Sequence, residues 1–169
     1  LCRGHKGGAV KAVDGSRIYV SGSIDQNQAS DSAGGIFAEN GSIVEMTGGN
    51  VSGNIGHHNS GGIYLNGSIL TMSEGASIDG NQSSEQGSFH RGGGIEAEGS
   101  SIRITDSSIT GNLTPTGSGE LVTGNGAGIY AKKTPVTITG GIISGNSADS
   151  SGAGIYLEGS LLTLQGSTI

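Results

Sequence analysis

Apolar and polar residues alternate along most of the chain in short segments, which are separated by turns that carry glycine or serine. Alternation with a period of two residues is typical of β-strands whose alternate side chains point to one face. The stretch 127–146, which is rich in isoleucine, contains no helical stripe. The pattern therefore predicts an all-β protein made of short strands.

One phrase recurs along the chain, for example as "GGIFAENGSIVEM" from Gly34 and "GGIYLNGSILTM" from Gly61. Each copy places an isoleucine or valine at the same point, and the intervals between these residues are 26, 27, 32, 34 and 26 residues. We use them as the landmark of each copy: Val10, Ile36, Ile63, Ile95, Ile129 and Ile155. Self-similarity of this period indicates a repeat architecture.

Each copy predicts three strands. The first strand carries the landmark residue, and the second carries the inward pairs Ile18 and Val20, Val44 and Met46, Leu70 and Met72, Ile102 and Ile104, Val136 and Ile138, and Leu162 and Leu164. The third strand offers one apolar residue: Ile24, Val51, Ile78, Ile109, Ile143 or Ile169. Strands of one polarity cannot pair as hairpins, but they can wind into coils whose equivalent strands stack in parallel. We therefore expect a parallel β-helix of about six coils with three short strands each, and the general preference for right-handed crossovers predicts a right-handed one.

An asparagine lies three positions after the apolar residue of the third strand in five copies: Asn27, Asn54, Asn81, Asn112 and Asn146. Stacked identical amides can hydrogen-bond to one another and to turn backbone, so we expect a structural ladder rather than a ligand site. From the asparagine to the next landmark the gap is 9 residues in three copies, 14 after Asn81 and 17 after Asn112. The insertions therefore predict two edge loops side by side, a place where repeat proteins often bind partners.

Composition narrows the function classes. The 169 residues include 35 glycines, and the net charge is −6 at pH 7. The regularly spaced apolar residues argue against disorder, and the absence of a Gly-X-Y period excludes collagen. The eight Lys and Arg residues are scattered and give no footprint for nucleic acid, and no apolar run reaches the roughly 18 residues of a membrane span. Cys2 is the one cysteine, so no internal disulfide is possible. We expect no cofactor, and the oligomeric state stays open.

The residue after each landmark points outward from the first strand. Four of these six residues are aromatic and are expected to be exposed: Phe37, Tyr64, Tyr130 and Tyr156. Glu96 occupies the same column, and Glu98 lies two positions further along. Rings beside carboxylates would stack on sugar rings and bind their hydroxyl groups, which predicts a glycan site. The alternative is that these side chains simply pack across strands.

Other chemistry is less well supported by the spacing. Glu96 and Glu98 point the same way on one strand, and Glu39 lies in the same column but two coils away. This spacing is poor for the acid pair of a glycosidase or lyase, so we assign no catalytic residue. His57, His58, Glu85 and His90 fall in edge loops of neighbouring copies, and a metal site there stays open beside simple solvation. A flat Thr-x-Thr face for ice binding is interrupted by Tyr19, Glu45 and Arg103.

The phrase "ISGNSADSSGAGIYLEGSLLTLQGSTI" resembles the "GGA(I/L)" and "SGN" repeats of the polymorphic outer-membrane proteins and related autotransporter-type bacterial surface adhesins. The resemblance extends from Gly8 to Ile169 and implies a right-handed β-helix of the pectin-lyase-like superfamily, exported to the cell surface. We therefore expect residues 1–169 to be a single segment of a longer, extracellular solenoid. The expected function is a non-enzymatic adhesin or stalk that binds glycans or another host or matrix ligand. The alternative is a polysaccharide lyase or glycoside hydrolase of that superfamily.

Overall fold

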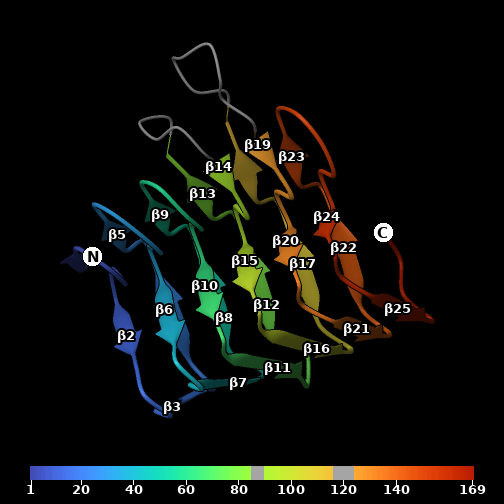
Figure 1. Cartoon of the computed structure of the whole chain (residues 1–169), viewed down its shortest axis with the longest axis horizontal. Coiled ribbons are helices and arrows are strands. Elements are labelled where there is room, and N and C mark those ends of the chain that lie inside the picture. The colour runs from blue at the N-terminus through green and yellow to red at the C-terminus, as the bar shows by residue number, and fades with distance from the viewer. Residues whose placement is uncertain (85–89, 116–123) are drawn as a thin grey trace.

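The computed structural model describes residues 1–84, 90–115 and 124–169. All regular structure in these ranges is β, and every strand pairing is parallel. Figure 1 shows equivalent strands lying side by side as the chain advances from its N-terminus to its C-terminus. The expected parallel β-helix of about six coils is confirmed. The described residues include no helix that is long and apolar enough to cross a membrane.

Three sheets correspond to the three strands predicted for each copy. Sheet B, which holds the landmark residues, contains β2 (Val10–Ala12), β6 (Ile36–Glu39), β10 (Ile63–Asn66), β15 (Ile95–Glu98), β20 (Ile129–Lys132) and β24 (Ile155–Glu158). Sheet C contains β3 (Arg17–Val20), β7 (Ile43–Thr47), β11 (Ile69–Ser73), β16 (Ser101–Thr105), β21 (Val136–Thr139) and β25 (Leu162–Gln165). Sheet D contains β4 (Ser23–Asp25), β8 (Asn50–Ser52), β12 (Ser77–Asp79), β17 (Ser108–Thr110) and β22 (Ile142–Ser144).

The solenoid has a fourth sheet, which the sequence pattern did not predict. Sheet A consists of two-residue strands, and all of them except β1 directly follow a ladder asparagine: β1 (Arg3–Gly4), β5 (Gln28–Ala29), β9 (Ile55–Gly56), β13 (Gln82–Ser83), β18 (Leu113–Thr114) and β23 (Ser147–Ala148). Next to it, β14 (His90–Arg91) and β19 (Gly124–Asn125) form the short sheet E. A strand of two residues is too short to show alternation, and the second residues of β5, β9, β13 and β18 are small and buried rather than large and apolar.

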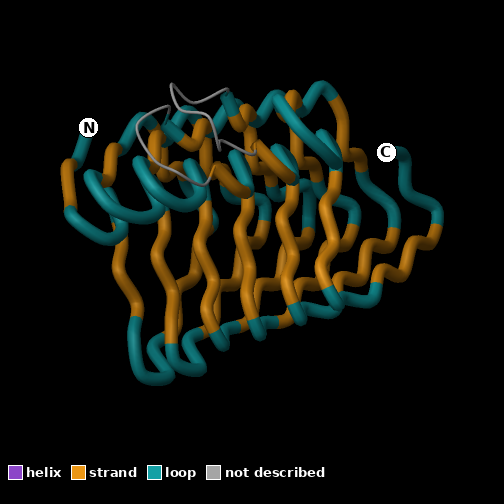
Figure 2. Tube along the Cα trace, turned by 45° about the horizontal axis from the view of Figure 1, so that its top comes forward, coloured by secondary structure: helices purple, strands orange, loops and turns teal. Residues whose placement is uncertain are grey.

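The core lies between the sheets and is formed mainly by the predicted inward residues, but in the last coil the predicted Leu164 and Ile169 are 45% and 56% exposed. Ile36, Ile63, Leu65, Leu70 and Ile78 are fully buried and belong to one continuous apolar cluster. Figure 2 shows how the sheets enclose this interior along the whole stack. Because equivalent residues pair directly, each inward side chain packs on its counterparts one coil away, for example Ile63 on Ile36 and Ile95.

The asparagines form the predicted ladder. The Oδ1 atom of Asn54 accepts hydrogen bonds from the backbone N of Asn27 at 2.9 Å and from its Nδ2 at 3.0 Å. The Nδ2 atom of Asn54 in turn donates to Asn81 Oδ1 and to the carbonyl oxygen of Ile24. The same pattern continues through Asn112 to Asn146. The ladder therefore satisfies buried backbone groups at the corner between sheets D and A, as a structural element rather than a ligand site.

Glycine before the landmark residue is required by close packing. A Cβ atom on Gly62 would lie against the carbonyl oxygen of Gly94 and 3.2 Å from the Cγ atom of Asn81. The backbone therefore passes so near the ladder that no side chain fits at this position. The hydrogen bond from Gly62 N to Gly93 O continues the parallel pairing through the corner.

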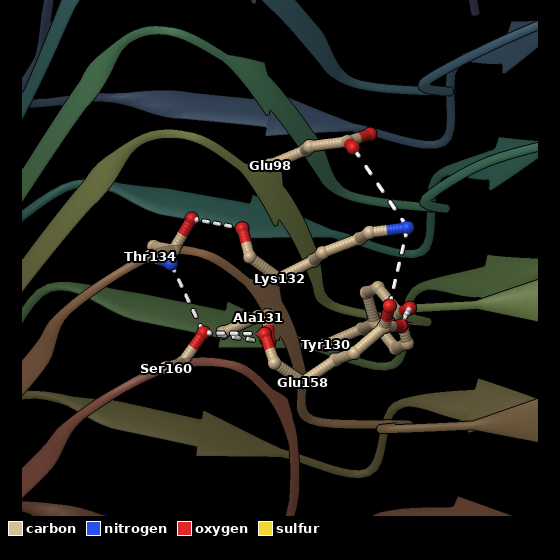
Figure 3. Close-up of polar contacts among 7 residues, drawn as sticks. All are labelled: Glu98, Tyr130, Ala131, Lys132, Thr134, Glu158 and Ser160. Atoms are coloured by element: carbon tan, nitrogen blue, oxygen red, sulfur yellow. Dashed lines mark hydrogen bonds and ion pairs between the residues drawn. The ribbon is translucent and has the colours of Figure 1, made fainter.

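A second ladder, of hydroxyl groups, lies at the turn between sheets B and C. In each step a backbone N–H donates to a hydroxyl oxygen of the next coil. Ser68 N donates to Ser100 (3.1 Å), Ser100 N to Thr134 (3.0 Å) and Thr134 N to Ser160 (3.0 Å). Figure 3 shows its last step, in which Thr134 and Ser160 meet. The sequence pattern did not predict this ladder, because serine is too common in the chain to stand out.

Candidate functional site

The outer face of sheet B carries the predicted outward column. Register pairs the residues that follow the landmarks on six consecutive strands: Lys11, Phe37, Tyr64, Glu96, Tyr130 and Tyr156. The structure therefore brings together all the side chains proposed from the sequence as a ligand site. Glu98 lies in the neighbouring outward column of the same sheet, between Asn66 and Lys132.

The expectation that these rings are exposed is wrong for the buried members of the column. Phe37 and Tyr130 are only 3% and 2% exposed, whereas Tyr64 and Tyr156 are half-buried. Stacking accounts for part of the burial, since the ring centroids of Phe37 and Tyr64 lie 5.1 Å apart and those of Tyr130 and Tyr156 lie 5.3 Å apart. Each stacked ring has one face that is closed to a ligand.

The chain that leads into each strand of sheet B covers more of the column. A Cβ atom on Gly7 would lie 3.2 Å from the Cβ atom of Phe37, and one on Gly126 would lie 2.8 Å from the Cα atom of Tyr130. Both glycines have positive φ, +72° and +61°, which lets the backbone fold back over the sheet. A period-two pattern reports only which face a side chain takes and contains no information about a segment that crosses that face.

Lys11 of the column has its Nζ atom 5.6 Å from the centroid of the Phe37 ring, and two further cations over the rings were missed in the sequence. Lys6 Nζ is 5.4 Å from the centroid of the Phe37 ring, and the Arg91 guanidinium is 4.9 Å from that of Tyr130. Each of these two cations stands four residues before a landmark and reaches the ring of the following coil. That shared position, followed directly by a glycine, is the signal that would have identified them.

Glu96 interrupts the aromatic stack between Tyr64 and Tyr130, and its side chain is 6% exposed. Burial raises the pKa of its carboxyl group to about 8, against the lowering effect of Arg91 and with a smaller raising effect of Glu98. Its Oε2 atom has no hydrogen-bond partner among the residues that the structure describes. Glu96 is therefore largely protonated at neutral pH, when a carboxyl group can donate a hydrogen bond.

The charged row beside the column is more accessible. Lys132 Nζ lies 3.2 Å from Glu158 and 4.0 Å from Glu98, so it bridges carboxylates on both neighbouring strands, as Figure 3 shows. The Tyr130 hydroxyl donates to Glu158 Oε2 at 2.7 Å. This hydrogen bond, together with Lys132, lowers the pKa of Glu158, whereas burial and the same contact raise the pKa of Tyr130.

The hydroxyl group of Tyr64 also has a shifted pKa. Burial raises the pKa of its hydroxyl to about 12, and the carboxyl groups of Glu96, Glu98 and Glu39 act in the same direction. The phenol therefore stays neutral and is available as a hydrogen-bond donor or acceptor. The column thus presents neutral polar groups in its buried part and fixed charges along its accessible edge.

A metal site at His57, His58, Glu85 and His90 stays open, because Glu85 lies outside the described residues. His58 is exposed, whereas His90 is buried. His57 is half-buried, and its Nε2 atom lies 3.2 Å from Gln28 Nε2, toward the preceding coil. Within residues 1–84, 90–115 and 124–169, no group of three His, Cys, Asp or Glu side chains is placed to hold a metal ion.

Comparison with protein-family models, with curated proteins and with solved structures finds no match to this chain. The function therefore has to be argued from the geometry of its own residues.

Proposed function

We propose that this chain is a non-enzymatic stalk of an extracellular, surface-attached bacterial protein, and that it acts as an adhesin for glycans. The observation that supports a stalk is the unbroken stacking of its coils, with the buried ladder running from Asn27 to Asn146. In a solenoid each coil rests on its neighbours, which gives an extended, stiff body with long continuous faces. The extracellular location is supported by the resemblance of the repeat phrases to surface adhesins.

The accessible edge of the sheet B column is the proposed glycan surface. Tyr156 is half-buried and stacks on Tyr130 with one face, and Glu158, Lys132 and Glu98 lie in the row beside it. An aromatic ring next to fixed hydrogen-bonding groups suits the apolar face and the hydroxyl groups of a sugar. In this proposal Phe37, Glu96 and Tyr130 are covered and hold the accessible groups in place, while Tyr64 lies at the half-open part of the column.

A glycan array tests this proposal. Wild-type protein is expected to bind a subset of glycans, and Tyr156→Ala is expected to weaken that binding about tenfold, the loss typical of one stacking contact. Tyr19→Ala is the matched control, because Tyr19 is 69% exposed on the outer face of sheet C. Equal weakening by the two variants, or no glycan bound by the wild type, would contradict the proposal.

A polysaccharide-active enzyme is the second candidate, and one observation favours it. Glu96, with a pKa raised to about 8, lies two residues from Glu98 on one strand, and a protonated and an ionised carboxyl group together form the usual pair for glycoside hydrolysis. The burial of Glu96 and the pairing of Glu98 with Lys132 argue against this role. Release of reducing or unsaturated ends from a polysaccharide panel, abolished by Glu96→Gln, would establish an enzyme and overturn the adhesin proposal.

A further inference from the structure

The first three coils form a cavity on the outer side of sheet A, away from the sheet B column. Its volume is about 420 Å³, and it is lined by Arg3, Gly4, His5, Gln28, Ser30 and His57. Its lining residues belong to β1, to β5 and to the segments that follow β1, β5 and β9, and Figure 1 shows β5 and β9 near the N-terminal end of the stack. A volume of this size falls within the range of small-molecule sites.

The register of sheet A explains why these residues meet. Arg3 pairs with Gln28, and Gln28 pairs with Ile55 one coil further on. Two positions later in each of these coils stand His5, Ser30 and His57. The backbone N of Ser30 donates a hydrogen bond to Gly4 O at 3.0 Å, so the pairing of the first two coils continues to this point. Arg3 and His5 of the first coil line the same cavity as Gln28 and Ser30 of the second, so these residues share one side of the stack.

The lining groups are hydrogen-bond donors and basic side chains. The guanidinium of Arg3 is exposed and makes no ion pair or side-chain hydrogen bond within the described ranges. The Nε2 atoms of Gln28 and His57 lie 3.2 Å apart, so the amide and the imidazole ring of two neighbouring coils are in contact at the cavity. The carboxylate of Asp31 lies 3.5 Å from His5 Nδ1 but does not line the cavity.

This concentration of basic groups is confined to the first three coils. The equivalent outward positions of later coils carry Gln82 and Ser84, Leu113 and Pro115, and Ser147 and Asp149, none of which is basic. The chain as a whole has a net charge of −6, so a cavity with an arginine and two histidines, and with no carboxylate among its described lining residues, stands apart from the rest of the surface.

We propose that this cavity binds a small organic molecule through an oxyanion, either a phosphate or a carboxylate group. Arg3 binds the anion with its planar fork of donors, and His5 and His57 flank it from the first and third coils. Ser30 and Gln28 supply neutral hydrogen bonds to the rest of the ligand, for which the cavity leaves room. This inference goes beyond the proposed function, since the site lies on another sheet and does not depend on the aromatic column.

Calorimetric titration with three probes of similar size tests the proposal: glucose 6-phosphate, glucuronate and uncharged glucose. We expect saturable binding of at least one anion and none of glucose, and the anion that binds more tightly identifies the oxyanion as phosphate or carboxylate. Arg3→Gln is expected to weaken binding about tenfold, as befits a hydrogen bond to a charged group, and His57→Gln by a smaller factor.

Arg103→Gln is the matched control, because Arg103 is exposed on β16 of sheet C and lies outside the cavity. It removes the same charge and is expected to leave the affinity unchanged, as is Tyr156→Ala on sheet B. Thermal unfolding checks that each variant is folded. The proposal is overturned if neither anion binds, if glucose binds as tightly as the anions, or if Arg103→Gln weakens binding as much as Arg3→Gln and His57→Gln do.

Discussion

Single buried side chains decide how polar groups are satisfied inside this solenoid. Asn54, Asn81 and Asn112 are fully buried, and each amide serves the coil on either side. Glu96 is the contrasting case, since its carboxyl group is nearly as buried but has an oxygen without a hydrogen-bond partner in the described part of the chain. Both cases lead to measurable effects on stability, because loss of the Asn81 amide should lower it and loss of the ionisable group of Glu96 should raise it at high pH.

Replacing Asn81 by alanine is expected to lower the free energy of unfolding by about 4 kcal/mol. The substitution leaves the backbone N of Asn54 and the carbonyl oxygen of Val51 without their partners in the interior, at roughly 1–3 kcal/mol for each buried group. Urea denaturation measures the change. Asn66→Ala is the control, since Asn66 is exposed in the same coil, and a loss below about 0.5 kcal/mol is expected there. Equal losses would show that Asn81 is not part of a buried ladder.

Glu96 is expected to make stability fall as pH rises. Its folded-state pKa of about 8 lies above the ordinary value of 4.5, so between these pH values the folded protein holds a proton that the unfolded chain releases. The stability contributed by the neutral carboxyl group is complete below about pH 4.5 and is lost as the pH passes 8. Glu96→Gln should be the more stable protein above pH 8, by at most about 5 kcal/mol, and the advantage should vanish near pH 4.

Urea titrations of wild type and Glu96→Gln at several pH values measure this difference. Glu98→Gln is the control, because Glu98 is exposed on the same strand and pairs with Lys132. A stability difference between wild type and Glu96→Gln that does not change with pH would contradict the raised pKa.

At the scale of the strands, the corners set the spacing between sheets. The glycine before four landmark residues of sheet B lies against the asparagine ladder, so the corner and the strand form one packed unit: Gly35, Gly62, Gly94 and Gly128. Other glycines are required only because the backbone has a positive φ. Gly67 is an example, since its φ is +58° but no described atom lies within 4 Å of the place that a Cβ atom would take. The two kinds of glycine therefore predict different costs for the same substitution.

Gly62→Ala is expected to cost about 3 kcal/mol or more, because the added methyl group would clash with the backbone at Gly94 and push on Asn81. Gly67→Ala should cost only about 1–2 kcal/mol, the penalty of a left-handed conformation at an open turn. Thermal and urea denaturation of the pair measure both. A larger loss at Gly67 would mean that close packing against the ladder is not what requires glycine at residue 62.

Sheets B and C could be predicted because each strand is long enough to show two alternating positions, as in Leu70 and Met72. Sheet D has one inward residue in each strand, but that residue is a large apolar one at the same place in every copy, such as Val51 or Ile78. Sheet A could not be predicted, because the single inward residue of a strand such as Gln28–Ala29 is small. The membership of the sheet B column followed from the repeat, but its burial did not. Lys6 and Arg91 cover rings of the following coil, and contacts between coils across a sheet face are not encoded in the period of any one strand.

At the scale of the whole molecule, equivalent residues lie in straight columns along one axis. On the outer face of sheet C, register connects Tyr19 to Thr163 through Glu45, Thr71, Arg103 and Thr137. Successive strands of a sheet lie ~4.8 Å apart, so five steps separate the first and last of these residues by about 24 Å. The stalk proposed for this chain requires that this spacing be held along the full stack.

A spin-label distance between residues 19 and 163 tests the stacking most directly. Tyr19→Cys and Thr163→Cys are introduced together with Cys2→Ser, and both labelled positions are exposed, so the labels leave the core intact. The parallel β-helix predicts a narrow distribution of distances between the labels. Its mean should lie at about 24 Å, the length of five strand spacings, apart from the contribution of the label arms. A broad distribution, or a mean distance well beyond that value, would contradict the stacking of the coils.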